Sequence, residues 1–330
     1  MTEVLAPAAP AVALTRSGRP RIQRRALHGV LLLDKPLGLS SNDALQKAKW
    51  LLRAEKAGHT GTLDPLATGL LPLCFGAATK FSQLSLEADK RYLATLALGT
   101  RTSTGDAEGE VLERRDADGI TREQIAAACA AFTGEIEQVP PMHSALKHEG
   151  KALYEYARQG VEIERQPRRV TIHEIAIVEM HAATVTLDVR CSKGTYIRTL
   201  AEDIGTRLGC GASLGALRRT GSGVLSLQGA VTLAQIEALP DAARASLLQT
   251  PDCLLAAQPE IRLSAAEAAR FLSGQRRRVA APDAGAVRVY GPEPRAFLGS
   301  AHITAGELIA DRLLTPPEVA ALLAAPESES

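Results

Sequence analysis

The chain of 330 residues is poor in aromatic side chains and has no long hydrophobic run. Phe, Trp and Tyr together make up 3% of it, with a single tryptophan. No apolar stretch approaches the roughly 20 residues that a membrane-spanning helix needs. The short apolar stretch near the start has no basic region ahead of it, which argues against a secretory signal. We therefore expect a cytoplasmic protein without a membrane partner.

Cysteine is also scarce, and its spacing excludes two common uses. The five cysteines are odd in number and include no Cys-x-x-Cys pair: Cys74, Cys129, Cys191, Cys210 and Cys253. Neither a disulfide framework nor a zinc site is indicated by this pattern. Reduced thiols are expected, and no metal ligand set is predicted.

Acidic residues are absent from one long stretch, although the net charge is only +1. No acid lies between Glu3 and Asp34, where five arginines cluster. Further basic groups are 168–169, 218–219 and 276–278. Such patches can bind phosphates even in a nearly neutral protein. Taken singly, each is better explained as a solvated surface pair or triplet.

The length and the order of local signals predict two domains. Residues 1–27, rich in Ala, Pro and Arg without any period, are interpreted as a flexible basic arm. Composition shifts again near 251–259. We expect a large α+β domain over 28–255, with a central mixed or antiparallel sheet and flanking helices. A small module at 258–330 completes the chain.

Several elements have clear local signals. Strands are predicted at 29–35, 92–98 and 184–191, and a polar loop at 100–110. Residues 138–160 are expected to be extended and exposed before a short helix near 154–158. Helices are predicted after the caps or capping boxes at 40–42, 121–124, 232–235, 264–267 and 315–318. Another helix, over about 197–208, is predicted from its apolar spacing and ends at glycines.

The segment HTGTLDPLATG, at 59–69, is the most informative motif. Pro65 disfavours helical backbone at Asp64 and has no N–H for the carboxylate to bind. An acid presented between glycines is a candidate nucleophile or base. Asp-Pro is nevertheless a common turn dipeptide, so the motif alone favours a solvated turn.

Five further segments, in order, accompany this motif: GVLLLDKPLGLSSN (29–42), DKRY (89–92), VPPMHSALK (139–147), LYEYARQG (153–160) and CSKGTYIRT (191–199). Together they resemble the bacterial TruB family, the tRNA pseudouridine-55 synthases. The resemblance runs from about Gly29 to the C-terminus. It implies the pseudouridine synthase fold for the large domain. More loosely, it implies a PUA-like β-barrel that binds RNA for the small module.

The resemblance implies an isomerase that converts uridine 55 in the T loop of tRNA into pseudouridine. The N1–C1′ bond breaks, the base turns and it rejoins through C5, a reaction that needs no cofactor. The target base must be flipped out of its stack, which costs a few kcal/mol. The implied partner is the tRNA T stem-loop, and we expect a monomer.

The matched motifs also imply site residues. Asp64 corresponds to the catalytic carboxylate, as nucleophile or base, and Arg198 to the cation that keeps it ionised. Tyr92 would stack on the flipped uracil. Leu217 and Tyr196 would line its pocket. The implied role of His59 is to enter the T loop, and Lys35 would support the pocket.

Several of these residues also have a simpler structural explanation. Arg198 could lie on the surface of a helix, Tyr92 in a strand core, His59 in an ordinary loop, and Leu217 in plain packing. Two other functions compete with this one: an RNA chaperone without catalytic activity, and a sister synthase that acts on another RNA. Sister enzymes typically carry Arg-Leu-Asp where this chain has Thr62-Leu63-Asp64.

Overall fold

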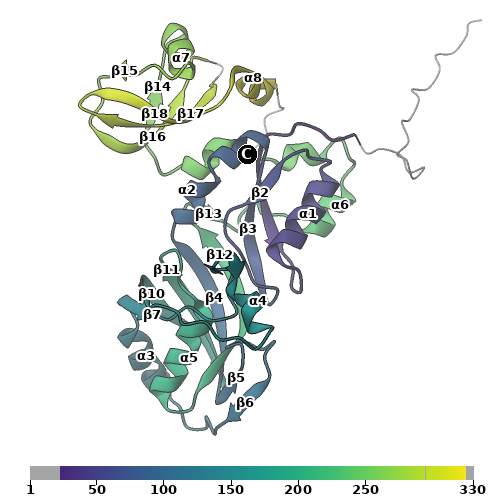
Figure 1. The fold of residues 1–330 in the computed structure, drawn as a ribbon, viewed down its shortest axis with the longest axis vertical. Helices are drawn as coiled ribbons and strands as arrows, with labels where there is room; N and C mark the ends of the chain where they lie inside the picture. The colour runs from purple at the N-terminus through teal and green to yellow at the C-terminus, as the bar shows by residue number, and fades with distance from the viewer. Residues whose placement is uncertain (1–22, 294, 325–330) are drawn as a thin grey trace, which may run out of the picture.

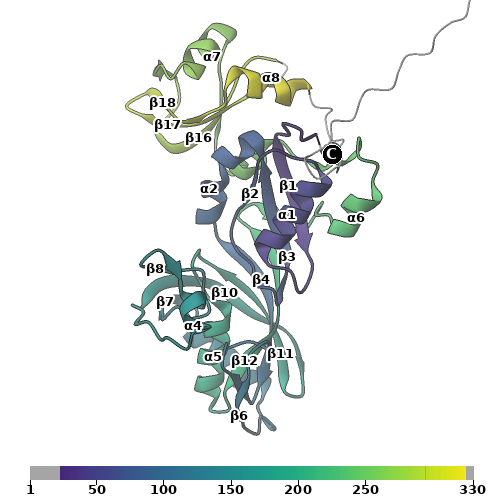
Figure 2. The same ribbon diagram turned by 45° about the vertical axis from the view of Figure 1, so that its right-hand side comes forward.

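The structure, a computed structural model, describes residues 23–293 and 295–324 and contains two separate large sheets. Figures 1 and 2 show an elongated molecule with the smaller sheet at one end. None of the helices in the described ranges is long and apolar enough to cross a membrane. All five cysteines are unpaired, as predicted.

The larger sheet has nine strands and a mixed topology. Its main path runs through β1 (Gly29–Lys35), β3 (Ala67–Phe75), β12 (Ala212–Ser222), β4 (Lys90–Leu98), β11 (Thr184–Cys191), β10 (Arg168–His181) and β7 (Gly134–Gln138). At its side, β2 (Ala57–His59) pairs with β3, and β13 (Leu225–Ser226) pairs with β12. The β3–β12 pair is parallel, and the other pairs are antiparallel.

Helices cover the two halves of this sheet separately. Helices α1 (Ser41–Leu51) and α6 (Leu233–Ala238) pack with β1 and β3, whereas α3 (Arg122–Ala131) and α5 (Ile197–Leu208) pack with β4, β10, β11 and β12. Shorter helices are α2 (Ser82–Glu87) and α4 (Leu153–Ala157), with 3₁₀ turns at Gly76–Lys80, Arg244–Leu247 and Pro251–Leu255. The predicted caps at Ser40, Thr121 and Thr232 are confirmed.

The smaller sheet has the order β14 (Glu260–Arg262), β16 (Ala284–Tyr290), β17 (Phe297–Thr304), β18 (Glu307–Leu313) and β15 (Arg277–Arg278). Helix α7 (Ala265–Leu272) begins at the predicted capping box of Ser264, and α8 (Pro316–Ala324) follows β18. This curled sheet is consistent with a PUA-like module. The α+β fold class is therefore confirmed.

An aromatic cluster joins the two sheets. Phe297 of β17 lies between Phe81 and Tyr290, with ring centroids 5.3 and 5.6 Å away. These rings belong to one apolar core with residues of β1 and β3. Lys80 adds an ion pair to Glu318 of α8 at 2.6 Å.

For two predicted loops and the predicted arm, the structure differs in detail from the sequence prediction. The loop at 100–110 contains β5 (Thr100–Thr102), which pairs with β6 (Val111–Arg114). The segment 138–160 contains the hairpin β8 (Lys147–His148) and β9 (Lys151–Ala152) before α4. Arg25 bridges to Ala54, and its guanidinium donates to the Leu52 carbonyl at 3.0 Å. These contacts place Arg25 with the folded chain, whereas residues 1–22 of the predicted arm lie outside the described residues.

Candidate active site

Asp64 lies in the loop that connects the antiparallel strands β2 and β3. The Ala67 N–H donates to the Asp64 carbonyl at 3.0 Å, and the Gly38 N–H donates to the Pro65 carbonyl at 2.9 Å. Gly69 has a φ of +96°, and a Cβ there would lie 2.3 Å from the Arg219 carbonyl oxygen. Only glycine fits this position, since both conformation and space exclude a side chain. The loop is therefore held on both sides of Asp64.

A serine at the start of α1 fixes the residue before Asp64. The Ser41 hydroxyl accepts from the Leu63 N–H at 2.7 Å and donates to the Leu63 carbonyl at 3.0 Å. Ser41 is 2% exposed, so the pair is shielded from water. The side chain of Asp64 remains 45% exposed. The backbone is thus rigid while the carboxylate faces open space.

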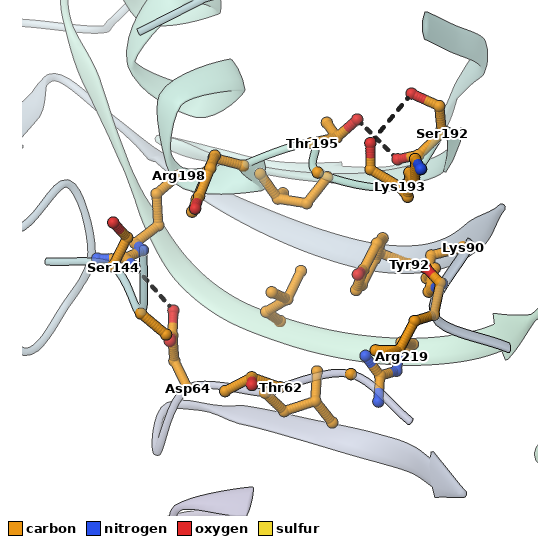
Figure 3. Close-up of a pocket in the computed structure, with 18 of the residues that line it drawn as sticks. Thr62, Asp64, Lys90, Tyr92, Ser144, Ser192, Lys193, Thr195, Arg198 and Arg219 are labelled. Carbon is orange, nitrogen blue, oxygen red and sulfur yellow. Dashed lines mark hydrogen bonds and ion pairs between the residues drawn. The ribbon is translucent and has the colours of Figure 1, made fainter. Parts of the chain in front are cut away.

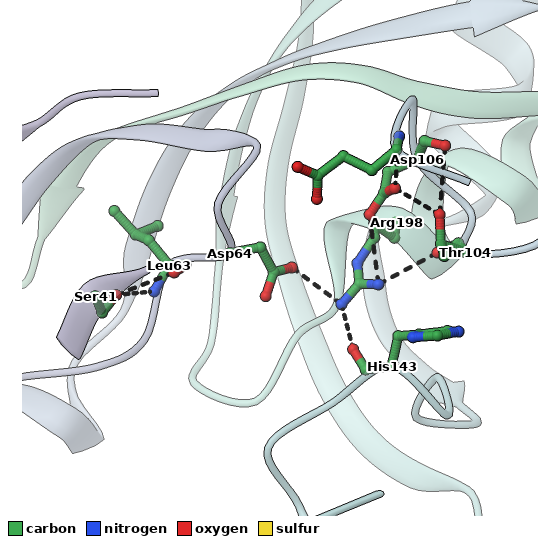
Figure 4. A network of polar contacts seen from close by, with 8 residues as sticks. Ser41, Leu63, Asp64, Thr104, Asp106, His143 and Arg198 are labelled. Carbon is green, nitrogen blue, oxygen red and sulfur yellow. Dashed lines mark hydrogen bonds and ion pairs between the residues drawn. The ribbon is translucent and has the colours of Figure 1, made fainter. Parts of the chain in front are cut away.

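Arg198 joins Asp64 to a second carboxylate (Figure 4). Its Nη2 lies 3.0 Å from Asp64 Oδ2, and its Nη1 lies 3.5 Å from Asp106 Oδ2. The guanidinium also donates to the carbonyls of His143, at 2.7 Å, and Thr104, at 3.2 Å. The Arg198 side chain is only 7% exposed. The alternative of a surface arginine is therefore wrong, and Arg198 is a fixed cation for Asp64.

Asp64 and Arg198 lie at a cavity of about 430 Å³. Three other predicted residues, Tyr92, Tyr196 and Leu217, also line it, so the structure brings five of the seven together. Figure 3 shows Asp64 and Arg198 on one side and Tyr92, Lys90 and Arg219 on the other. Tyr92 comes from β4, Leu217 from β12 and Tyr196 from the residue before α5. The cavity therefore forms where the centre of the sheet meets the Asp64 loop.

Lys35 and His59 do not line this cavity. Lys35 is fully buried, and its Nζ donates to the carbonyls of Leu39, at 2.6 Å, and Pro36, at 2.9 Å. Burial lowers the pKa of Lys35 to about 8, against an opposing effect of Asp64. His59 is partly buried at the end of β2, and burial lowers its pKa. Lys35 thus braces the turn after β1, and His59 lies outside the cavity wall.

The sequence motifs did not identify two cations of the cavity, Arg219 and Lys90. Arg219 is 1% exposed and its Nε donates to the Leu70 carbonyl at 2.7 Å, but its Nη2 has no hydrogen-bond partner among the described residues. Lys90 donates to three backbone carbonyls at 2.6–2.9 Å. Burial lowers the pKa of both groups, that of Lys90 to about 8. This end of the cavity is therefore positive and poorly hydrated.

The alternation of strand β12 explains why Arg219 was missed. Its neighbour Arg218 points the other way and binds both carboxylate oxygens of Asp34, at 2.6 and 3.0 Å. The sequence had favoured a solvated pair at 218–219, and this interpretation is wrong. By contrast, Arg168 and Arg169 are exposed, as a surface pair should be.

Two buried polar residues complete the site, and neither was predicted. Asp106 is 3% exposed and lies in the loop between β5 and β6. Gln138, at 2% exposed, accepts from the Tyr196 N–H at 3.0 Å and donates to its carbonyl at 3.3 Å. In the sequence, Asp106 is marked only by the polar turn TSTGDAEGE, and nothing local marks Gln138. In the described ranges, no three His, Cys, Asp or Glu side chains are grouped as a metal site would require.

Three family models match successive parts of the chain. The TruB family pseudouridylate synthase N-terminal domain matches residues 49–197. The tRNA pseudouridylate synthase B C-terminal domain matches 198–254, and the pseudouridine synthase II TruB C-terminal model matches 259–314. The order of these matches follows the resemblance read from the sequence.

Relatives and solved structures agree with these matches. A protein of Verminephrobacter eiseniae named tRNA pseudouridine synthase B is 58% identical over 93% of this chain and 95% of its own length. A protein of Cupriavidus metallidurans with the same name is 60% identical over 89% and 96%. A chain of a crystal structure of a Cbf5–Nop10–Gar1 complex has 24% identity and a TM-score of 0.68 over 95% of this chain and 93% of that one, which shows a shared fold. The chain therefore belongs to the TruB family of pseudouridylate synthases.

Proposed function

We propose that this protein isomerises uridine 55 in the T loop of tRNA to pseudouridine, with Asp64 as the catalytic carboxylate. The observation that carries the proposal is the Asp64–Arg198 pair, 3.0 Å long, at the edge of a cavity whose lining includes both tyrosines and the leucine named above. A carboxylate held by a buried cation remains available as a nucleophile or base. Relatives with about 60% identity carry the name tRNA pseudouridine synthase B.

The reaction requires the uracil to leave the T-loop stack and enter the cavity. Tyr92 would stack on the base, while Tyr196 and Leu217 hold its edges. The N1–C1′ bond breaks and a C5–C1′ bond forms, while N1 gains a proton and C5 loses one. All atoms of the base are kept, so the reaction needs neither oxidant nor group donor. We propose that His59 enters the space that the flipped base leaves, and that Lys35 supports the pocket from beneath.

We propose a separate role for the part of the chain around each of the two sheets. Residues 28–255 would form the catalytic domain, and 258–330 would form the RNA-binding module that contacts the tRNA beyond its T loop. We propose that the protein acts as a monomer in the cytoplasm.

The decisive test replaces Asp64 with asparagine, which keeps the shape and removes the charge. We expect Asp64→Asn to lose pseudouridine formation on an unmodified tRNA transcript, measured by mass spectrometry, while tRNA binding persists. Asp118→Asn is the matched control, because Asp118 is an exposed acid in a loop outside the cavity. Turnover retained by Asp64→Asn would contradict the assignment. Product from a whole tRNA but none at position 55 would favour a sister activity.

A further inference from the structure

The only tryptophan of the chain lies on the surface, away from the Asp64 cavity. Trp50, in the last turn of α1, is 60% exposed. An exposed indole at this position contributes little to the core, since the buried face of α1 consists of other residues. Tryptophan is enriched at interfaces, because its ring can pack on a partner while its N–H binds a polar group.

A second cavity, of about 250 Å³, lies beside this indole. It is lined by Arg24, Gln46, Lys49, Trp50, Arg53 and Ala54. Three of these six residues are cations and none is an acid. The cavity therefore combines one aromatic face with a positive wall.

The charges of this wall are only partly neutralised. Arg53 lies 3.5 Å from Asp241, which it shares with Arg25 and Arg244, each at 3.8 Å. Arg24 donates to the Ala54 carbonyl at 3.4 Å, and Lys49 makes no ion pair with a described residue. One carboxylate thus serves three arginines, and the site keeps a net positive charge.

We propose that this Trp50 site binds an unpaired nucleotide of the tRNA, with its base on the indole and its phosphate on the cations. Aromatic faces stack on any base, and Lys or Arg beside them bind the phosphate, as in proteins that hold single-stranded nucleic acid. The inference takes from the proposed function only that tRNA is the RNA bound. It adds a contact separate from the base-flipping cavity.

Charge argues against the chain's own N-terminal segment as the occupant. Residues 4–23 contain no acid and three arginines, so they would repel the cations of the site. An acidic protein segment would satisfy the cations but would leave the indole without a stacking partner. A nucleotide satisfies both parts of the site.

The site is also within reach of an RNA bound at Asp64. Trp50 lies nine residues after Ser41 on α1, which corresponds to about 14 Å along the helix axis. Ser41 binds Leu63, the neighbour of Asp64. A rigid helix therefore connects the two sites over a distance of a few nucleotides.

The sole tryptophan makes a direct test feasible, because all indole fluorescence of the protein reports on this site. We expect unmodified tRNA to quench Trp50 emission and to shield it from acrylamide. Trp50→Ala should weaken tRNA affinity about 5- to 100-fold, as loss of one stacked base does. Trp50→Phe should keep most of that affinity because its ring can still stack. A T-arm minihelix that quenches equally would place the nucleotide in the T arm, and quenching by whole tRNA alone would place it elsewhere.

Charge variants test the phosphate contact separately. Arg24→Gln with Lys49→Gln should reduce the slope of log affinity against log salt by roughly 0.7 to 0.9 per lost contact. Arg114→Gln with Arg207→Gln, two exposed cations of β6 and α5, should leave the slope unchanged.

Two results would overturn the site. One is unchanged Trp50 emission at tRNA concentrations where filter binding shows a complex, together with unchanged affinity of Trp50→Ala. The other is equal quenching by polyglutamate, which would show a response to charge alone. Binding and emission are measured without turnover. An enzyme that forms no pseudouridine would therefore contradict the proposed function. An active enzyme whose Trp50 emission does not respond to tRNA would contradict only this site.

Discussion

At the scale of single residues, burial affects the three buried cations of the Asp64 cavity, Arg198, Lys90 and Arg219, differently. Arg198 has two carboxylates within 3.5 Å, which offset the cost of removing its charge from water. Lys90 and Arg219 have no described carboxylate within ion-pair distance and rely on carbonyl oxygens instead. Carbonyls stabilise a cation less than a carboxylate does. Burial of these two charges therefore costs free energy, and an electron-rich ligand in the cavity would offset part of it.

The lowered pKa of Lys90, about 8, predicts a pH dependence of stability. Between about pH 8 and the ordinary lysine value near 10.4, the unfolded chain binds more protons at this residue than the native protein does. The contribution of Lys90 to the free energy of unfolding must then rise with pH. From pH 8 to 9 we expect wild type to gain about 1 kcal/mol relative to Lys90→Met, measured by urea unfolding.

The difference in stability between the two proteins is the quantity to compare, because burial raises the pKa of Cys74, Cys129 and Cys191, so these thiols also make stability depend on pH. Lys90→Met will be less stable throughout, since three carbonyls lose their donor. The same comparison with Lys47→Met, an exposed lysine of α1, should give a difference that is constant with pH. A constant difference for Lys90→Met as well would contradict the assigned shift.

At the scale of elements, local signals predicted helices better than strands. Capping boxes located the starts of α3, α6 and α7, and the left-handed glycine at 209 ends α5 as expected. These signals involve residues only three or four positions apart, so they are legible in the sequence. Strands β1 and β11 were also predicted at their observed bounds.

Strands β10 and β12 were not predicted because bulges interrupt their alternation. The pairing of β12 with β4 shifts register between Leu214 and Ala216 and again between Arg219 and Gly221. A bulge moves the following side chains to the opposite face, which breaks the period of two. Strand β3 was missed for a different reason, since Gly69 and Pro72 resemble turn residues. The same limit applies to the site: Asp106 reaches Arg198 across 92 positions of sequence, a distance that no local pattern reveals.

The contact between α1 and the Asp64 loop predicts a positioning effect of Ser41. Ser41→Ala leaves the N–H and carbonyl of Leu63 buried without partners, at a cost of about 1–3 kcal/mol for each group. The loop should then hold Asp64 less firmly, and we expect kcat to fall at least tenfold with little change in KM.

Ser40→Ala is a closely matched control for this variant. The Ser40 hydroxyl caps α1 by accepting from the Asp43 N–H, and its loss costs about 0.5–2 kcal/mol. Ser40→Ala weakens the start of α1 without touching Leu63, whereas Ser41→Ala keeps the cap of α1 and frees Leu63. Equal kcat values in the two variants would show that helix stability, rather than the Leu63 contact, supports the loop.

At the scale of the whole molecule, the two sheets share one core rather than meeting through a polar interface. Phe297, Tyr290 and Leu314 come from the C-terminal part. Residues of β1 and β3 come from the large sheet, and Phe81 comes from the start of α2. Packed apolar cores transmit a change on one side to the other, because they have few voids. The orientation of the small sheet relative to the Asp64 cavity should therefore depend on these rings.

Phe297→Ala tests this coupling. Phe297 is 6% exposed and contacts rings from both parts, so its truncation should cost about 3–5 kcal/mol of stability. We expect faster amide hydrogen exchange in β16 and β17 and also in α2, which follows Phe81. Phe271→Ala is the control, because Phe271 is buried in the core of the small sheet alone. It should accelerate exchange in the small sheet and leave α2 protected. If Phe297→Ala also leaves α2 protected, the shared core does not couple the two sheets, and the small sheet would be free to adjust its position when tRNA binds.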